Sequence, residues 1–491
     1  MVRLSELARR HGGTLRDAST DPDVHDVELD SRRVRAHTLF AALPGQRADG
    51  ARFVADARAR GACAVLCAEA PAEAGLPVWT HAAPRSTAGL AAADVHGHPS
   101  RALFVVGITG TNGKTTIAWL TAQLLEAVGL VPAVLGTVVN RLAGGLEVPA
   151  THTMADAPTL QRLLAQHRER GGRSVALEVS SHGLAQERDA GLELSVGVFS
   201  NLTRDHLDFH GSMEAYAGAK ARMFERLGSR GVAVIHAGVD GAARMTQAAR
   251  SSGARVVTYS AGSRADLCAS RVRPEPGGTR LNIQGMGVAD TELFLPLVGR
   301  HNVENALAAL AAALLTEASP AALLQGLASV HSAPGRLQSV DTRGRPFHVY
   351  VDYAHTADGL ARVLEALRES MAARGGRLIC LFGCGGNRDK GKRAPMGAAV
   401  GAAADVAVLT SDNPRDEEPG AILADVLPGL AGTRARLLVE PDRRAAIALA
   451  IAEARAGDIV LLAGKGHERT QTVRGIDHPF DDAAVAAQVL A

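Results

Sequence analysis

The segment Thr109–Thr116, TGTNGKTT, constrains the fold and function of this chain more than any other. It follows the apolar run Ala102–Ile108 and enters a helical pattern. Glycines let successive backbone N–H groups turn toward phosphate oxygens, and Lys114 adds a positive charge at the helix N-terminus. The general phosphate-loop spacing would place a further glycine where Ile108 stands, so we predict a shorter variant that binds a nucleoside triphosphate. A plain glycine turn would explain both glycines but not the Lys-Thr-Thr sequence.

The composition indicates an enzyme that acts on small molecules. The chain has 491 residues, enough for three domains of roughly 100 to 200 residues each. Lys and Arg total 53 and Asp and Glu total 51, which gives a net charge of +2 without a block of like charge. Neither a nucleic acid nor an anionic membrane is therefore an expected partner.

Cysteine usage and the lack of a long apolar segment favour a cytoplasmic protein. The five cysteines are sparse and odd in number, which argues against a secreted disulfide framework. We expect four of them to be buried apolar residues rather than zinc ligands: Cys63, Cys67, Cys380 and Cys384. The first residues lack the apolar core of a signal peptide, and no run of about 18 apolar residues follows.

Strand-like and helical patterns alternate along the chain, as is typical of parallel sheets covered by helices. We predict an α/β fold with domains at 1–97, 98–334 and 335–491, because His98-Pro-Ser and Ala333-Pro-Gly-Arg have linker composition. In the third domain, predicted strands at 377–382, 405–410 and 458–463 each precede a polar loop. Ligands bind beyond the carboxyl ends of parallel strands, so these loops are the expected site of a second substrate.

Two polar residues near the carboxyl ends of predicted central strands are candidate metal ligands. Glu178 lies in the apolar run Ser174–Val179, where a buried carboxylate needs a partner, such as a magnesium ion that bridges nucleotide phosphates. An exposed strand end is the alternative. His206 follows the apolar run that ends at Phe199 and could ligate a metal, although a lone histidine in such a loop is more often structural.

Lys220 lies on the apolar face of a predicted helix. The helix follows the capping residue Ser212, and the face carries Tyr216, Met223, Phe224 and Leu227 at helical spacing. Burial would lower the pKa of the lysine, and a neutral amine can add carbon dioxide to become an anionic ligand. A lysine whose stem reaches out to solvent is the alternative.

Ten motifs in a fixed order carry a resemblance to a known family. They are GTNGKTT, EVSSHGL, NLTRDHLDFHG, AKARMF, GRHNVENALAA, PGRLQSV, VDYAHT, GKRAPMG, DNPRDEEP and GKGHE, within residues 30–482. Together they resemble the Mur ligase family, and within it the members that add diaminopimelate to the peptidoglycan precursor. The resemblance implies a central P-loop-type ATPase domain with a parallel sheet, a Rossmann-like C-terminal α/β domain and a smaller N-terminal α/β domain that binds a UDP-sugar.

The resemblance also implies roles for particular residues. ATP would be held by Gly110, Thr111, Asn112, Gly113, Lys114, Thr115 and Thr116, with Asn305, Arg336 and Asp352 around the nucleotide. One Mg²⁺ would be held by Thr115 and Glu178, and a second by His206 and a carbamylated Lys220. The uridine part of the acceptor would contact Leu29, Ser31 and Gln46, and its muramoyl dipeptide would contact Thr153, Ser180, Gln186 and Arg188. The incoming amino acid would contact Arg388, Asp412, Asn413, Pro414, Arg415, Gly464 and Glu468.

The chain departs from the family pattern before the second central helix. Relatives usually show Asn-Thr-Thr-Pro where this chain has His152-Thr153-Met154-Ala155. Of two threonine contacts to the acceptor only Thr153 remains, because Met154 has no hydroxyl. The turn expected at 236–240 is also altered.

The expected reaction joins an amine to a carboxylate. ATP would phosphorylate the D-glutamyl γ-carboxylate of UDP-N-acetylmuramoyl-L-alanyl-D-glutamate, and the amine of meso-2,6-diaminopimelate would attack the acyl phosphate while the third domain closes. Arg415 matches a motif that selects diaminopimelate, since its planar guanidinium pairs with a carboxylate that lysine lacks. The protein is expected to be a monomer.

Three alternatives stay open. A lysine-adding ligase should lack the DNPR motif, and a folylpolyglutamate-type ligase should lack the Leu29-Asp-Ser-Arg segment of the first domain. A nucleotide-binding regulator on the same fold would have no need of the intact set Lys114, Glu178, His206, Lys220 and Arg415.

Overall fold

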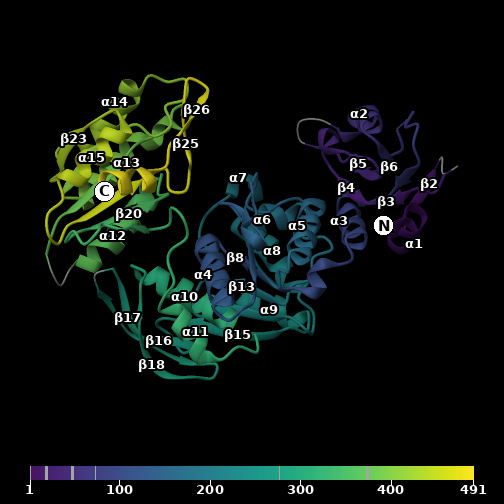
Figure 1. The fold of residues 1–491 in the computed structure, drawn as a ribbon, viewed down its shortest axis with the longest axis horizontal. Coiled ribbons are helices and arrows are strands. Elements are labelled where there is room, and N and C mark those ends of the chain that lie inside the picture. The colour runs from purple at the N-terminus through teal and green to yellow at the C-terminus, as the bar shows by residue number, and fades with distance from the viewer. Residues whose placement is uncertain (1, 17–19, 46–48, 72, 276, 372–374) are drawn as a thin grey trace. The chain divides into compact units, whose positions relative to one another are not determined.

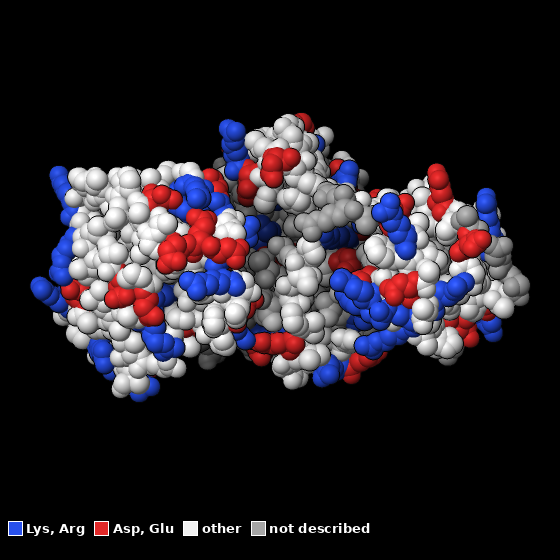
Figure 2. Space-filling view, turned by 90° about the horizontal axis from the view of Figure 1, so that it is seen from above, with Lys and Arg blue, Asp and Glu red and all other residues white. Residues whose placement is uncertain are grey.

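The computed structural model describes residues 2–16, 20–45, 49–71, 73–275, 277–371 and 375–491. The chain folds into two units, the first formed by residues 1–266 and 308–319 and the second by residues 267–307 and 320–491 (Figure 1). On the face drawn in Figure 2, basic and acidic side chains are interspersed. Among the described residues, no helix combines the length and apolar character needed to cross a bilayer.

The N-terminal part of the first unit is a five-stranded sheet flanked by helices. The strand order is β2-β7-β6-β5-β4, with only β2 antiparallel to its neighbour. The strands are β2 (Thr14–Arg16), β4 (Asp26–Glu28), β5 (Thr38–Ala41), β6 (Ala62–Cys67) and β7 (Val78–Thr80), and β1 (Val2–Arg3) pairs with β3 (Asp23–Val24). The helices are α1 (Leu4–His11), α2 (Val54–Ala59) and α3 (Pro84–Val95). A side chain at Gly89 of α3 would lie 2.7 Å from the Cβ atoms of Ala157 and Ala190, so the glycine allows α3 to pack closely on the central domain.

The central part of the first unit is built on six parallel strands in the order β9-β12-β8-β13-β14-β15. Their bounds are β8 (Phe104–Thr109), β9 (Pro132–Leu135), β12 (Ser174–Glu178), β13 (Val196–Phe199), β14 (Val232–His236) and β15 (Arg255–Ser260), and antiparallel β10 (Asn140–Arg141) and β11 (Glu147–Val148) extend the β9 edge. The helices are α4 (Lys114–Ala127), α5 (Ala157–Glu169), α6 (Ser181–Ala185), α7 (Leu207–His210), α8 (Met213–Glu225) and α9 (Ala242–Ser251). Because β12, β8 and β13 are neighbours, the loops that follow them meet at one edge of the sheet.

The second unit contains an antiparallel meander and a mainly parallel sheet. The meander is β16 (Leu267–Glu275), β17 (Gly278–Gly285) and β18 (Val288–Leu295), followed by α10 (Arg300–Ala313) and α11 (Pro320–Leu327). The sheet has the order β19-β20-β24-β21-β22-β23, with only β19 antiparallel. Its strands are β19 (Gln338–Val340), β20 (His348–Asp352), β21 (Leu378–Phe382), β22 (Val406–Leu409), β23 (Arg436–Val439) and β24 (Ile459–Ala463).

Five helices and a hairpin complete the C-terminal sheet. The helices are α12 (Ala357–Met371), α13 (Arg393–Ala403), α14 (Pro419–Leu430), α15 (Arg443–Ala452) and α16 (Asp482–Val489), and the hairpin is β25 (Thr470–Val473) with β26 (Ile476–Pro479). Every residue of β21, β22 and β24 is buried, as expected for strands covered on both faces.

The predicted α/β fold is confirmed, and the structure differs from the prediction in some details. Leu227 lies beyond the end of α8 at Glu225, although its side chain is buried. The meander β16–β18 was not foreseen, although Gly285-Met286-Gly287, all three with positive φ, forms a tight turn between its last two strands. Cys67, Cys380 and Cys384 are buried as expected, whereas Cys63 is only half-buried. The domain boundaries at 97 and 334 stay a prediction.

Candidate active site

The glycine-rich loop opens helix α4 at the carboxyl end of β8. Gly113 has a φ of 89° and Lys114 is the first helical residue. A side chain at Gly110 would lie 1.9 Å from Ser200 Oγ, so only glycine fits there. The loop is braced from the segment after β13, because Asn201 accepts hydrogen bonds from the N–H groups of Thr111 and Asn112, both at 2.9 Å. The N-terminus of α4 thus carries a lysine and a loop held in one conformation, which suits a phosphate chain.

Glu178 is buried at the end of β12 beside the first turn of α4. Its carboxylate accepts hydrogen bonds from Thr115 Oγ1 at 3.0 Å and from Thr137 N at 2.9 Å and Oγ1 at 3.1 Å. Glu178 is only 1% exposed, so the alternative of an exposed strand end was wrong. Thr115 and Glu178 place two hard oxygen donors next to the loop, and this chemistry fits a magnesium ion.

Lys220 is buried on α8, and the predicted cap and apolar face of that helix are confirmed. Ser212 Oγ accepts from Ala215 N, and Tyr216, Met223 and Phe224 are buried with the lysine. Lys220 Nζ donates to the carbonyl oxygen of Gly110 at 2.8 Å and lies 4.5 Å from the centre of the Tyr216 ring. Burial, and secondly the charge of Lys114, lower the pKa of Lys220 well below its usual value. The lysine therefore does not reach solvent, and a neutral amine suits carbamate formation.

His206 lies at the start of α7 with a positive φ of 52° and an exposed side chain. Its ring packs edge-on against His182 and Tyr216, with centroids 4.8 and 6.1 Å apart. His206 and Lys220 thus both contact Tyr216. The described residues contain no group of three or more His, Cys, Asp or Glu side chains arranged around a metal position, so a second magnesium would need the carbamate and phosphate oxygens as further ligands.

A pocket of about 150 Å³ is lined by residues of both the N-terminal domain and the central domain. It brings together three residues predicted to bind the acceptor, Leu29, Gln186 and Arg188. Arg188 is fixed, because its Nη1 donates to Met154 O at 2.6 Å and its Nε and Nη2 donate to Gln186 Oε1. The remaining lining residues are Arg85, His152, Asp156, Ala157, Pro158 and Glu187. Arg85 and His152 give this pocket two further nitrogen donors that the sequence analysis did not place there.

The other predicted acceptor residues lie nearby or are part of the framework. Thr153 Oγ1 lies 3.1 Å from Thr137 Oγ1, whose hydroxyl hydrogen is donated to Glu178. Ser180 caps α6 through Gly183 N, and Ser31 is buried at the start of a short 3-10 helix, Ser31–Arg33. Gln46 lies outside the described residues. Met154 is 1% exposed and packs on Gly183, so its side chain is part of the hydrophobic core.

Residues predicted to select the amino acid gather at the carboxyl ends of β21, β22 and β24. Asn413 Nδ2 donates to Glu468 Oε2 at 2.8 Å, and a side chain at Gly464 would lie 2.7 Å from Asp412 Oδ2. Buried Lys465, which the sequence analysis missed, donates to Asn413 Oδ1 at 3.0 Å and Glu468 Oε2 at 3.2 Å. Its neighbours in the sequence, Gly464 and Gly466, gave no signal of a buried charge.

Arg415 and Arg388 both lie close to Gly385, at which a side chain would be 2.9 Å from Arg415 Nη1 and 3.8 Å from Arg388 Cγ. Arg415 Nη1 donates to the carbonyl oxygen of Gly386 at 2.8 Å. Among the described residues no carboxylate forms an ion pair with Arg415. A side chain at Gly386 would lie 1.9 Å from Pro414 O, so the loop that follows β21 and the loop that follows β22 are in direct contact.

The predicted nucleotide-side residues of the second unit have structural partners. Asp352 accepts from Leu337 N at 2.7 Å and Ala354 N at 2.8 Å, and burial raises its pKa against the effect of these hydrogen bonds and of Arg336. The Arg336 guanidinium lies over the Tyr353 ring at 5.2 Å. Asn305 Nδ2 donates to Asn302 Oδ1 within α10.

Matches to known proteins extend over nearly the whole chain. The model of the Mur ligase middle domain matches residues 108–313, the Mur ligase glutamate ligase domain matches 335–466, and the catalytic domain of the Mur ligase family matches 23–106. The UDP-N-acetylmuramoyl-L-alanyl-D-glutamate–2,6-diaminopimelate ligase of Chromobacterium violaceum is 46% identical over 473 residues, or 94% of each chain. The chain belongs to the Mur ligase family. This Mur ligase is also 42% identical to the ligase of the same name from Streptomyces coelicolor, over 99% of this chain and 96% of that one.

A solved structure supports the same assignment. The structure of a UDP-N-acetylmuramoyl-L-alanyl-D-glutamate–2,6-diaminopimelate ligase matches this Mur ligase with a TM-score of 0.73 and 35% identity, over 99% of this chain and 98% of that one. The recognition of the family from the ten motifs is confirmed, and so is the α/β architecture with three domains.

Proposed function

We propose that this Mur ligase uses ATP to join 2,6-diaminopimelate to the D-glutamyl γ-carboxylate of UDP-N-acetylmuramoyl-L-alanyl-D-glutamate, in cytoplasmic peptidoglycan synthesis. The observation that carries the choice of amino acid is Arg415, a cation in a fixed loop without a carboxylate partner among the described residues. Diaminopimelate has a distal carboxylate that can pair bidentately with a guanidinium, whereas lysine would leave that guanidinium unpaired. Asp412 and Glu468 offer carboxyl oxygens as hydrogen-bond acceptors for the amino groups.

The loop Gly110–Thr116 is proposed to bind the ATP phosphates, with Lys114 as the cation next to the γ-phosphate. Transfer of the γ-phosphoryl group to the D-glutamyl carboxylate gives an acyl phosphate and ADP. The amine of diaminopimelate attacks the acyl carbon, and phosphate leaves as the amide forms. The protein contributes mainly by holding the reactants in line, since the acyl phosphate is already reactive.

Thr115 and Glu178 would hold one magnesium ion, and His206 with carbamylated Lys220 a second. Magnesium supplies positive charge that stabilises the oxygens of the transferred phosphoryl group. The pocket lined by Leu29, Gln186 and Arg188 is proposed to receive the acceptor. Arg85 and Arg188 then present positive charge to its anionic groups.

A substrate panel tests this proposal. Purified protein is incubated with ATP, magnesium, the UDP-muramoyl dipeptide and either diaminopimelate or lysine, and phosphate and nucleotide-linked products are measured. We expect a tripeptide product with diaminopimelate, at a kcat/KM at least about tenfold above that with lysine. Equal incorporation of lysine would identify a lysine-adding ligase. Absence of phosphate release with every amino acid would instead support a non-catalytic regulator.

A further inference from the structure

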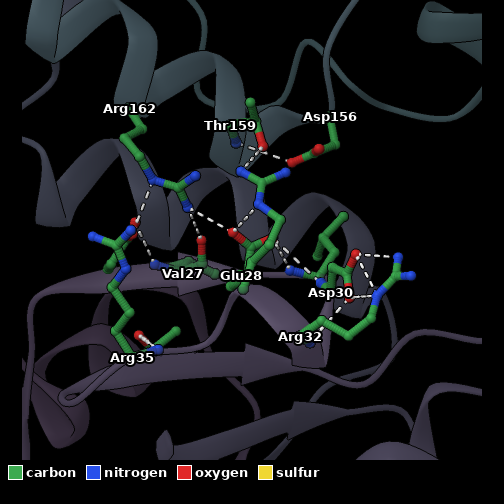
Figure 3. Close-up of polar contacts among 12 residues, drawn as sticks. Val27, Glu28, Asp30, Arg32, Arg35, Asp156, Thr159 and Arg162 are labelled. Carbon is green, nitrogen blue, oxygen red and sulfur yellow. Dashed lines mark hydrogen bonds and ion pairs between the residues drawn. The ribbon is translucent and has the colours of Figure 1, made fainter. Parts of the chain in front are cut away.

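One arginine of the central domain binds the end of a strand in the N-terminal domain. Figure 3 shows Arg162, on α5, directed at β4. Its Nε donates to Asp26 Oδ2 at 2.9 Å, and its Nη2 donates to Val27 O at 3.0 Å and Glu28 Oε2 at 3.1 Å. Three successive residues of β4 therefore share one guanidinium, and only 19% of the Arg162 side chain is exposed.

Glu28 connects Arg162 to the segment that follows β4. Its other oxygen, Oε1, accepts from the backbone N–H groups of Leu29 at 2.9 Å and Asp30 at 3.3 Å. Arg33 Nε lies 3.2 Å from Glu28 Oε2, and the Glu28 side chain is 4% exposed. A buried carboxylate with several donors has one stable position. The backbone at Leu29 and Asp30 is thus fixed from α5 through a single side chain.

The same helix forms part of the wall of the acceptor pocket. Asp156, which caps α5 through Thr159 N, lines the pocket together with Ala157, Pro158 and Leu29. Arg33 Nη2 reaches Thr159 Oγ1 at 3.5 Å, so the segment contacts the first turn of α5 directly as well (Figure 3). Pocket-lining residues of the two domains are therefore joined by a network of hydrogen bonds and ion pairs that crosses from one domain to the other.

The partners of Asp26 in this network stabilise its charged form. Burial alone would raise the pKa of Asp26, but the hydrogen bond from His96 and the charge of Arg162 lower it below its usual value. Asp26 also contacts His96, at 3.1 Å. Arg162 forms a second ion pair, with Glu28.

We propose that Arg162 is a positioning residue that holds the segment Leu29–Arg33 at a fixed distance from the dipeptide end of the acceptor pocket. The inference rests on the proposed function and on the family resemblance, which assigns Leu29 and Ser31 of this segment to the uridine part of the acceptor. Arg162 does not touch the substrate in this scheme. Its contribution appears only when one acceptor molecule must be held at its nucleotide and at its peptide end together.

The test compares Arg162→Met and Arg162→Lys with a control on the same helix, Arg168→Met. Arg168 contacts Gly97 O at 3.4 Å and does not contact the segment after β4. Lysine keeps the charge but cannot reach three acceptors in a plane. For both Arg162 variants we expect the KM for the UDP-linked acceptor to rise by about tenfold or more. The KM values for ATP and diaminopimelate, and the activity of the control, should stay near those of the wild type.

A second acceptor and a double variant make the test specific. The second acceptor is the muramoyl dipeptide that lacks UDP. The wild type and the Arg162 variants should act on it with similar kcat/KM, because it has no nucleotide end to be positioned. Arg162→Met combined with Glu28→Gln should raise the acceptor KM no further than Arg162→Met alone. An unchanged KM for the UDP-linked acceptor in Arg162→Lys, or the same loss with both acceptors, would overturn the inference. A wild-type protein without ligase activity would instead contradict the proposed function.

Discussion

Lys114 and Lys220 both donate to the carbonyl oxygen of Gly110, at 3.0 and 2.8 Å. Two ammonium groups on one carbonyl repel each other, and Lys220 is the more deeply buried of the two. The pKa of Lys220 is lowered accordingly, first by burial and then by Lys114. The loop that we propose to bind phosphate thus also helps to lower the pKa of Lys220, which favours the reaction of its amine with carbon dioxide.

Lys220→Ala should abolish most activity, because the carbamate that would bind the second magnesium is lost. We expect a decrease of roughly 10- to 100-fold or more, and partial recovery when short carboxylic acids are added at millimolar concentration. The measurement is the rate of phosphate release with and without acetate. Arg222→Ala is the matched control, since Arg222 is an exposed residue of the same helix. Wild-type rates in Lys220→Ala would rule out a carbamate role.

Arg415→Met should reduce the preference for diaminopimelate. Removal of the guanidinium takes away a charge-assisted pair of about 1 to 3 kcal/mol, so the ratio of kcat/KM for diaminopimelate over lysine should fall about tenfold or more. Arg474→Met serves as the control, because Arg474 is exposed and its backbone N–H, not its side chain, bonds to Arg415 O. An unchanged ratio would move the selection of the distal carboxylate to another residue, with Arg388 the first to examine.

Asp482→Asn should destabilise the C-terminal domain strongly. Arg443 and Asp482 form an ion pair whose two side chains are both 0% exposed, and Arg443 also donates to Ala463 O at 3.0 Å. Loss of one partner leaves a buried unpaired charge, at a cost of about 3 to 5 kcal/mol. Urea unfolding checks this value. Asp358→Asn, which removes an exposed pair with Arg362, should change stability by less than about 1 kcal/mol.

The pair of Glu417 with Arg393 should contribute stability that depends on pH. The hydrogen bond from Arg393, followed by that from Asn387 N, lowers the pKa of Glu417 to about 2, well below its usual value. A carboxyl with a lowered pKa in the folded state stabilises the protein above pH 4.5, and the contribution is lost as the pH falls toward 2. Glu417→Gln should therefore lower the unfolding temperature at pH 7, and the difference from the wild type should shrink in acid. A difference that stays constant between pH 7 and pH 3 would contradict this assignment.

The sequence predicted those features that depend on local pattern. The apolar run around Glu178 and the helical face around Lys220 each indicate burial, because a polar residue within a regular apolar stripe faces the same core as its apolar neighbours. Glycine and lysine spacing likewise predicted the glycine-rich loop that opens α4. The resemblance to a family added Gln186 and Arg188, which by pattern alone resemble surface residues.

Contacts between distant segments could not be predicted in this way. Arg162 and Glu28 are 134 residues apart in the chain, and Arg443 and Asp482 are 39 apart. Charged residues on helices and at strand ends are usually solvated, so nothing in their immediate neighbours indicates a buried partner. The meander β16–β18 was missed for a different reason, since its alternation is interrupted by shifts of register at Ser270/Arg273 and Ile283/Gly285.

The carboxylate of Glu28 has a bearing on how this enzyme can evolve. Two guanidinium groups and two backbone amides share it, so a substitution at any donor alters the geometry available to the others. Mutational effects at these positions should depend on one another rather than accumulate independently. Lineages that change α5 should therefore carry compensating changes in the strand it faces, and this pair of elements should be inherited as a unit.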